Sequence, residues 1–106
     1  MPRLVICAFK PRPGKQAQLI AVIEKQWQIL KSEGLVTDRP RYAMQALDGT
    51  IVEVFEWQSP EAIEAAHHNA VVLALWDEFE AACEYVPLAS LSESLHPFSE
   101  FQPLLI

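Results

Sequence analysis

The sequence predicts a single α+β domain whose elements follow the order strand, helix, strand, strand, helix, strand. Three observations lead to this prediction: short apolar runs rich in strand formers, two longer segments with apolar residues at helical spacing, and an Asp-Gly pair between the two middle strands. The chain has 106 residues, of which 51% are hydrophobic and 21% are charged. This length and composition suit one globular domain, so we expect residues 1–106 to form a single unit.

A strand over residues 3–10 and a helix over residues 15–33 begin the chain. The apolar run RLVICAFK is typical of a strand, and PRPG ends it. Gly34 follows the helix at the position where a C-cap glycine belongs. The helix has one apolar face, which is formed by Leu19, Ile20, Ile23, Trp27 and Leu30.

Two strands over residues 41–47 and 50–58 form a predicted hairpin. Asp48-Gly49 between them is a strong hairpin signal, because these residue types suit the backbone of a tight turn. We therefore expect the two strands to pair in antiparallel orientation.

The second helical region begins at Ser59-Pro60, which places an N-cap serine before a proline in the first turn. Ile63 marks the buried side of its first part, but a later apolar stripe is out of phase with Ile63 by about half a turn. One straight helix cannot bury both, so we expect a bend near His68-Asn69, with Asn69 as the cap of the second piece. The later stripe consists of Val72, Leu75, Trp76, Phe79 and Cys83.

A strand over residues 84–92 and an extended apolar tail over residues 94–106 complete the chain. Pro87 lacks the N–H that a strand ladder needs, so we expect the last strand at an edge of the sheet. A four-stranded antiparallel sheet with both helices on one face, the ferredoxin-like βαββαβ arrangement, is a compact solution for this order of elements. We expect the tail to pack at a dimer interface.

The second face of the predicted sheet is also apolar. On the third strand, Ile51, Phe55 and Trp57 point to one side, and Val52 and Val54 point to the other. Because two helices cover only one face, the other face is left as a candidate interface. We therefore expect a homodimer in which two sheets pack face to face.

Composition argues against several partners and sites. A net charge of -6 and a pI of about 4.9 disfavour binding to nucleic acid or to an anionic membrane surface. No apolar run approaches the ~20 residues of a membrane span, and the N-terminus lacks a signal-peptide pattern, so we expect a cytoplasmic protein. Cys7 and Cys83 lie in apolar segments where reduced, buried thiols are usual, and no ligand cluster indicates a metal site.

His67 is the candidate catalytic residue. Ala66, His67 and Ala70 lie on the same side of the helix as Ile63, whereas His68 lies about 140° away. We therefore expect His67 to project toward the sheet beside the bend. A neutral imidazole suits proton abstraction from a phenolic substrate or a hydrogen bond to its anion. The alternative is a structural histidine bonded to a carbonyl near the bend.

The segment EWQSPEAIEAAHHNAVVLALWDEF resembles the antibiotic biosynthesis monooxygenase family of the dimeric α/β-barrel superfamily. The shared pattern is a strand that ends in an aromatic residue, a short helix, an Ala-His pair, a polar break and a second helix with aromatics. The resemblance in element order covers residues 3–91, and it implies a homodimeric α/β barrel with a small apolar cavity in each protomer. Some members oxygenate polycyclic aromatic compounds without metal or flavin, because the substrate anion supplies an electron to O₂.

A related branch of the superfamily binds and degrades heme. It uses a tryptophan at the end of the third strand, a histidine ten residues later as axial ligand and an asparagine on the first strand. Trp57 and His67 match the first two of these residues, whereas Cys7 stands at the place of the asparagine. Asn69 is the only asparagine in the chain.

Three functions remain open at this point. The leading hypothesis is a cofactor-independent monooxygenase that acts on a small hydrophobic phenolic or enolisable compound. The alternatives are a heme-binding or heme-degrading protein with His67 as axial ligand, and a non-catalytic dimer that binds a small apolar ligand. Each candidate contact residue also has a structural interpretation, in the core or at an interface. The side chains expected to contact the ligand are Trp57, Trp76, Tyr42, Tyr85, Cys7 and Phe79.

Overall fold

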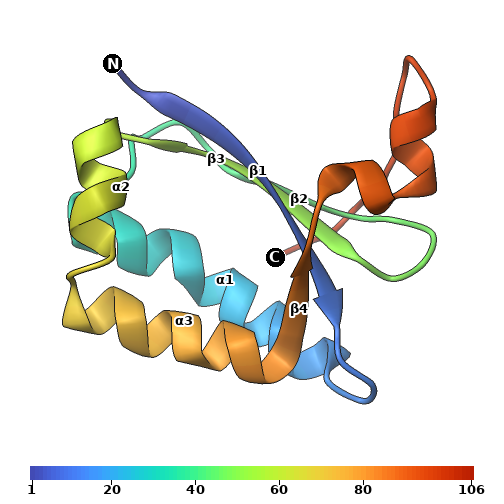
Figure 1. The fold of residues 1–106 in the computed structure, drawn as a ribbon, viewed down its shortest axis with the longest axis horizontal. Coiled ribbons are helices and arrows are strands. Elements are labelled where there is room, and N and C mark those ends of the chain that lie inside the picture. Colours follow the sequence, from blue (N-terminus) through green and yellow to red (C-terminus); the bar gives the residue numbers. More distant parts are fainter.

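The computed structural model describes all 106 residues as a five-stranded antiparallel sheet with three α-helices. The strand order is β4-β1-β3-β2-β5, and Figure 1 shows α1, α2 and α3 together on one side of the sheet. None of these helices has the length and apolar content to cross a bilayer. The elements are β1 (Arg3–Pro11), α1 (Gln16–Ser32), β2 (Tyr42–Gln45), β3 (Ile51–Trp57), α2 (Pro60–Ala66), α3 (Ala70–Ala82), β4 (Cys83–Val86), the 3₁₀ segments η1 (Leu88–Ser90) and η2 (Ser92–Leu95), and β5 (Gln102–Pro103).

The predicted α+β class is confirmed, but the sheet has five strands instead of four. The additional strand comes from the C-terminal tail, in which Gln102 and Pro103 pair with β2. The tail is therefore not wholly extended as predicted, since it begins in η2 and folds back onto the sheet of its own chain (Figure 1). Leu95 and Phe98 remain exposed on this arm.

The last predicted strand is shorter than expected, because β4 ends at Val86 and Pro87 lies just beyond it. Proline provides no N–H for the ladder, so the chain turns into η1 at this point. The predicted position of this strand at a sheet edge is confirmed. Since β4 pairs only with the part of β1 from Ala8 to Pro11, the first half of β1 has no partner on that side.

The predicted helix end at Gly34 and the predicted hairpin turn at Gly49 both have a positive φ, which glycine adopts without strain. Gly34 follows α1 with a φ of 73°, and Gly49 turns the β2–β3 hairpin with a φ of 92°. In the hairpin, the Thr50 N–H donates to the Asp48 carboxylate at 2.8 Å. The boundaries of α1 differ by one residue at each end from the predicted helix over residues 15–33.

The predicted bend in the second helical region is confirmed as a break between α2 and α3. Ser59 caps α2 by accepting a hydrogen bond from the Ala62 N–H at 3.0 Å. Asn69 caps α3, because its Oδ1 accepts hydrogen bonds from the N–H groups of Val71 and Val72 at 2.9 and 3.1 Å. The break allows α3 to bury its own apolar stripe against α1 and the sheet.

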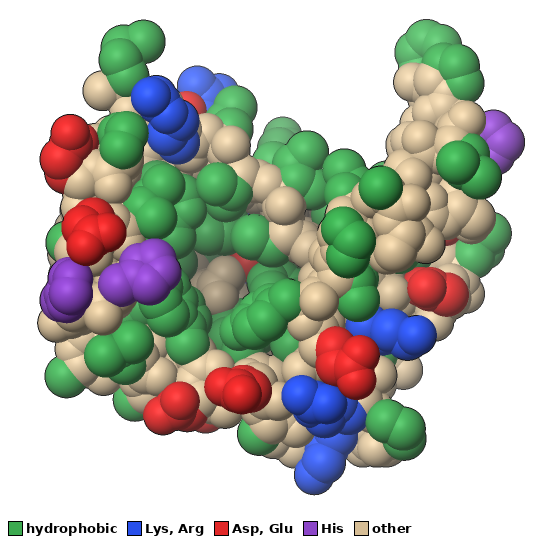
Figure 2. Space-filling model, viewed as in Figure 1, with side chains coloured by type: hydrophobic (Ala, Val, Ile, Leu, Met, Phe, Trp, Pro, Cys, Tyr) green, Lys and Arg blue, Asp and Glu red, His purple; other side chains and the backbone are tan.

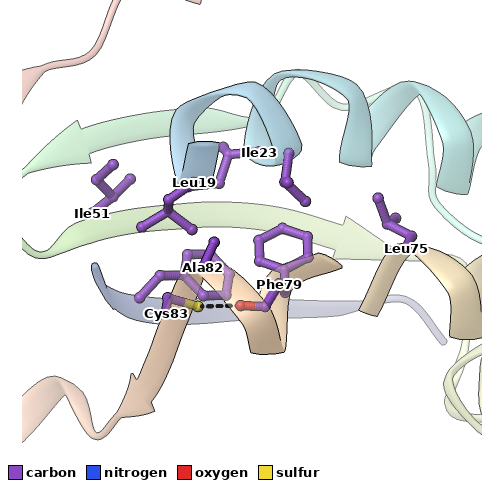
Figure 3. Packing of buried hydrophobic residues seen from close by; sticks show 9 residues of the cluster. Leu19, Ile23, Ile51, Leu75, Phe79, Ala82 and Cys83 are labelled. Carbon is purple, nitrogen blue, oxygen red and sulfur yellow. Dashed lines mark hydrogen bonds between the residues drawn. The ribbon is translucent and has the colours of Figure 1, made fainter. Parts of the chain in front are cut away.

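The main core lies between the helices and the sheet. Figure 3 shows its centre, where side chains of α1 and α3 meet β3. Phe79 is 1% exposed there, and its ring centroid lies 4.9 Å from that of Phe9. The Cys83 thiol donates to the Phe79 carbonyl at 3.1 Å, drawn as a dashed line in Figure 3. The residues labelled in Figure 3 are Leu19, Ile23, Ile51, Leu75, Phe79, Ala82 and Cys83.

The opposite face of the sheet is covered only at one end, which corrects the expectation that it is wholly bare. There Leu91, which lies between η1 and η2, packs on Ala8 and Val52, with the tail residue Phe101 at the margin. At the other end, Leu4, Ile6 and Tyr42 remain 59%, 55% and 69% exposed. We call this second part the open sheet face and include in it the half-buried Val54, which pairs with both Ile6 and Tyr42.

Candidate functional site

A cavity of about 690 Å³ lies between the unpaired half of β1 and helix α3. It is lined by 17 residues, of which 13 are hydrophobic, and Figure 2 shows the hollow surrounded by hydrophobic side chains. Because β4 ends at Val86, no strand covers β1 beside this hollow. The early end of β4 therefore keeps the cavity open at the sheet edge.

Aromatic side chains form much of the cavity wall. Trp57 lies at the end of β3, where it is 7% exposed and its ring centroid lies 5.4 Å from that of Phe55. Trp76 contributes from α3, and Tyr85 from β4, where it is 59% exposed. Large rings on several sides suit a flat apolar ligand. Trp57, Trp76 and Tyr85 thus line the same cavity, and their contact with a ligand stays a prediction.

A polar cluster of Gln26, Glu53 and Arg41 lies at the buried side of the cavity. Glu53 is 0% exposed and Gln26 is 4% exposed, but only Gln26 lines the cavity. The Gln26 Nε2 donates to Glu53 Oε1, and Arg41 Nη1 donates to Glu53 Oε2 at 3.1 Å. Arg41 also donates to the Ile23 carbonyl at 2.9 Å. Burial raises the pKa of Glu53 to about 7, although the guanidinium of Arg41 favours the ionised form.

Cys7 lines the cavity from β1, directly opposite Glu53 on β3. Burial, and then the negative charge of Glu53, raise the pKa of the Cys7 thiol to about 12. A thiol with this pKa stays protonated near neutral pH and is a poor nucleophile or metal ligand. Cys7 is therefore a small packing residue of the cavity wall.

His67 does not line the cavity, and it is exposed rather than directed at the sheet. Its Nδ1 lies 2.8 Å from the Ile63 carbonyl, which matches the structural alternative for this histidine. Its ring meets Trp76 edge to face, with the centroids 5.1 Å apart, so His67 contacts a side chain of the cavity wall. The orientation was predicted from Ile63, but the fully buried residue of α2 is Ala66. A residue that follows Ala66 is turned about 100° away from its direction.

Tyr42 and Phe79 also lie outside the cavity lining. Tyr42 belongs to the open sheet face, on the opposite side of the sheet from the helices. Its strand, β2, lies between β3 and β5 in the sheet. Phe79 belongs to the main core, where the packing of α3 directs it away from the cavity.

The polar cluster was not predicted from the sequence, although both of its buried members carry a signal. Gln26 interrupts the apolar face of α1 between Ile23 and Leu30, and Glu53 interrupts the inward positions of β3 between Ile51 and Phe55. A polar residue at a core position of a helix or strand needs a buried partner. Two such residues on elements that pack against each other were a reason to expect a buried hydrogen bond between them.

The residues present do not fit a heme site. An axial histidine has to point into the cavity, whereas His67 lies outside its lining. Asp77 and Glu80 are exposed lining residues, and no Lys, Arg or His is among the lining residues. These carboxylates disfavour a ligand that itself carries carboxylates.

Comparison with known proteins supports the fold and leaves the function open. No protein-family model matches the chain, and no curated protein matches it significantly in sequence. Among solved structures, the chain is similar to that of Rv0793 from Mycobacterium tuberculosis, with a TM-score of 0.65 and 20% sequence identity. The match covers 82% of this chain and 87% of that chain, so almost the whole domain shares its α+β fold.

Proposed function

We propose that this protein binds a small, flat, hydrophobic molecule in the cavity between β1 and α3. The observation that carries the proposal is the aromatic wall formed by Trp57, Trp76 and Phe55 around a space of about 690 Å³. Burial of apolar ligand surface supplies about 25 cal/mol per Å², and stacking on the indole rings adds to it. The exposed Asp77 and Glu80 favour an uncharged ligand over an anion.

Binding is tested by isothermal titration with 2-naphthol as the probe. We expect Trp76→Ala to weaken binding about tenfold, because a ring of the wall is lost. Trp27→Ala is the matched control, since Trp27 does not line this cavity. Equal affinities of the wild type and Trp76→Ala, or no binding by the wild type, would contradict the proposal.

A second candidate function is the cofactor-independent oxygenation of a phenolic or enolisable compound that the family resemblance implies. The observation that favours it is the contact of His67 with Trp76. The imidazole lies outside the lining, so a proton from a bound substrate has to reach it through a water molecule. In this reaction anthrone loses a proton, its anion passes an electron to O₂, and the resulting radicals combine into a C–O bond. Cleavage of the O–O bond with loss of the second C–H proton gives anthraquinone and water. One anthrone thus consumes one O₂.

Oxygenation is tested by O₂ consumption and anthraquinone formation from anthrone. If His67 takes the proton, His67→Ala lowers the rate by about a hundredfold, whereas His68→Ala leaves it unchanged. His68 is the matched control, because its ring is 74% exposed and bonds only to the neighbouring Glu64. A rate no higher than that in buffer would reject the oxygenase and leave the binding function in place.

We further propose that the protein forms a homodimer through the open sheet face. Leu4, Ile6, Val54 and Tyr42 form this face, and the exposed Leu95 and Phe98 on the C-terminal arm extend the apolar surface. A two-fold contact brings the same patch of each copy together, so an apolar patch finds a complementary surface on a second copy of itself. The proposed contact lies on the face of the sheet opposite the helices, and it borders the cavity at Ile6, which also belongs to the cavity lining.

A further inference from the structure

Gln26 is the one buried polar side chain in the cavity wall. It projects from α1 and is 4% exposed, whereas the other polar lining residues, Asp77, Glu80 and Tyr85, are exposed. An apolar cavity with a single buried carboxamide has one place where a polar group of a ligand finds a partner away from bulk water.

The orientation of the Gln26 carboxamide is determined by its neighbour. The Gln26 Nε2 donates to Oε1 of Glu53. An ionised carboxylate only accepts hydrogen bonds, so it holds the amide nitrogen and turns the amide oxygen away. Arg41 Nη1 holds the other carboxylate oxygen at 3.1 Å and is itself anchored on the Ile23 carbonyl at 2.9 Å.

The Gln26 amide oxygen has no protein donor. The Gln26 side chain makes its one hydrogen bond through Nε2. The buried side-chain polar atoms without a partner are Trp27 Nε1 and Thr50 Oγ1, so Gln26 Oε1 is not enclosed by protein. It therefore reaches open space, and the open space that Gln26 lines is the cavity.

We propose that Gln26 is the specificity-determining residue of the cavity and that its amide oxygen accepts a hydrogen bond from the hydroxyl group of an aromatic alcohol. The proposal rests on the proposed binding function and names the class of ligand: a fused-ring phenol whose rings contact Trp57 and Trp76. Glu53 is the positioning residue that keeps the acceptor turned into the cavity. A ligand without a donor leaves this buried acceptor unpaired, which lowers its affinity relative to the alcohol.

Titration of Glu53 changes this preference, because a protonated carboxyl is itself a donor. Protonated Glu53 donates to Gln26 Oε1 after the amide turns over, and the amide then presents N–H groups to the cavity. The groups that face Glu53 are Arg41 before β2, Gln26 on α1 and the Cys7 thiol on β1, while its partner on β2 is the uncharged Ala43. We therefore expect the preference for an aromatic alcohol to decrease as the pH falls through about 7, the pKa of Glu53.

The test compares 2-naphthol with 2-methylnaphthalene, in which a methyl group of similar size replaces the hydroxyl. The ratio of the two dissociation constants is measured for the wild type and for Gln26→Leu, so that the difference in hydration of the two probes cancels. We expect Gln26→Leu to shift this ratio about tenfold against 2-naphthol and to leave binding of 2-methylnaphthalene intact. Gln28→Leu is the matched control, because Gln28 lies two residues away on the exposed side of α1.

Glu53→Gln is the second variant, and it keeps the shape of the polar cluster if Gln26→Leu fails to fold. For Glu53→Gln, the ratio of the dissociation constants of the two probes is expected to be independent of pH, whereas the wild-type ratio changes near pH 7. An unchanged ratio in Gln26→Leu, or the same pH dependence in Glu53→Gln as in the wild type, would overturn the assignment of Gln26 while leaving the binding function standing. Failure of the wild type to bind either probe would overturn both.

Discussion

Cys7 and Glu53 lie opposite each other on the paired strands β1 and β3, and both side chains are on the helix-covered face of the sheet. Cys7 lines the cavity, and Glu53 lies behind the cavity wall, where it accepts a hydrogen bond from Gln26. The negative charge of Glu53 is thus placed beside a thiol and is balanced by the guanidinium of Arg41. Two groups whose pKa values are raised by burial thus occupy paired positions in the sheet.

Neither thiol of the native protein is expected to react with a disulfide reagent at about pH 8, because only the thiolate is reactive. Burial raises the pKa of Cys7 to about 12 and that of Cys83 to about 11. The release of thionitrobenzoate measures the reaction, and unfolding in guanidinium is expected to expose both groups. In Glu53→Gln the pKa of Cys7 is expected to fall, because a negative neighbour is removed. Rapid labelling of native Cys7 would contradict the raised pKa.

The stability of the protein is expected to decrease as the pH rises from 4.5 to about 7. The pKa of Glu53 is raised in the native state, so within this window the native state holds a proton that the unfolded state has lost. The stabilising contribution is fully present below pH 4.5 and is lost as the pH rises through the native pKa. It amounts to about 3 kcal/mol at roughly 1.4 kcal/mol per pKa unit.

Urea unfolding of the wild type and of Glu53→Gln at several pH values measures this contribution. The difference between their free energies of unfolding isolates Glu53 from the other titrating groups. We expect the difference to change between pH 4.5 and 7 and to be constant above that range. A difference that is the same at every pH would show that Glu53 titrates normally.

Asn69→Ala is expected to lower the free energy of unfolding by about 1 kcal/mol, because α3 loses its N-cap. Asn69→Asp distinguishes the capping hydrogen bonds of this side chain from its hydrogen bond to Glu33. Aspartate still accepts from the N–H groups of α3, but it cannot replace Asn69 Nδ2 as the donor to Glu33 at 2.9 Å and adds a like charge there. We expect Asn69→Asp to be destabilising at low salt and to recover when Glu33→Gln is added. No recovery in the double variant would exclude repulsion as the cause.

Ile6→Lys is expected to convert the proposed dimer into a monomer. Ile6 is 55% exposed in the open sheet face, where a lysine on each copy places like charges in an apolar contact. Because Ile6 also lines the cavity, the variant is judged by its mass and not by ligand binding. Sedimentation equilibrium measures the mass, and Val71→Lys, on a 49% exposed position of α3, is the control. A monomeric wild type would contradict the proposed interface, as would a dimer that persists in Ile6→Lys.

The order of elements, the hairpin turn and the helix break were all predictable from short stretches of sequence. Gly49, Ser59 and Asn69 act through hydrogen bonds and backbone conformations of residues next to them in the chain. Such signals do not depend on how the rest of the molecule packs. The alternation of inward and outward side chains along β3 is also a local signal, and it assigns Phe55 and Trp57 to the helix-covered face.

The sequence by itself therefore determined the α+β class, the element order and the aromatic residues Trp57 and Trp76 of the cavity wall. The tertiary structure decided three further points: the cavity opens where β4 stops before Pro87, Glu53 pairs with Gln26 and Arg41, and His67 lies outside the cavity. The physical reason is that these features depend on contacts between residues distant in the chain. Local periodicity gives the side of an element on which a residue lies, whereas packing decides which neighbour it meets there.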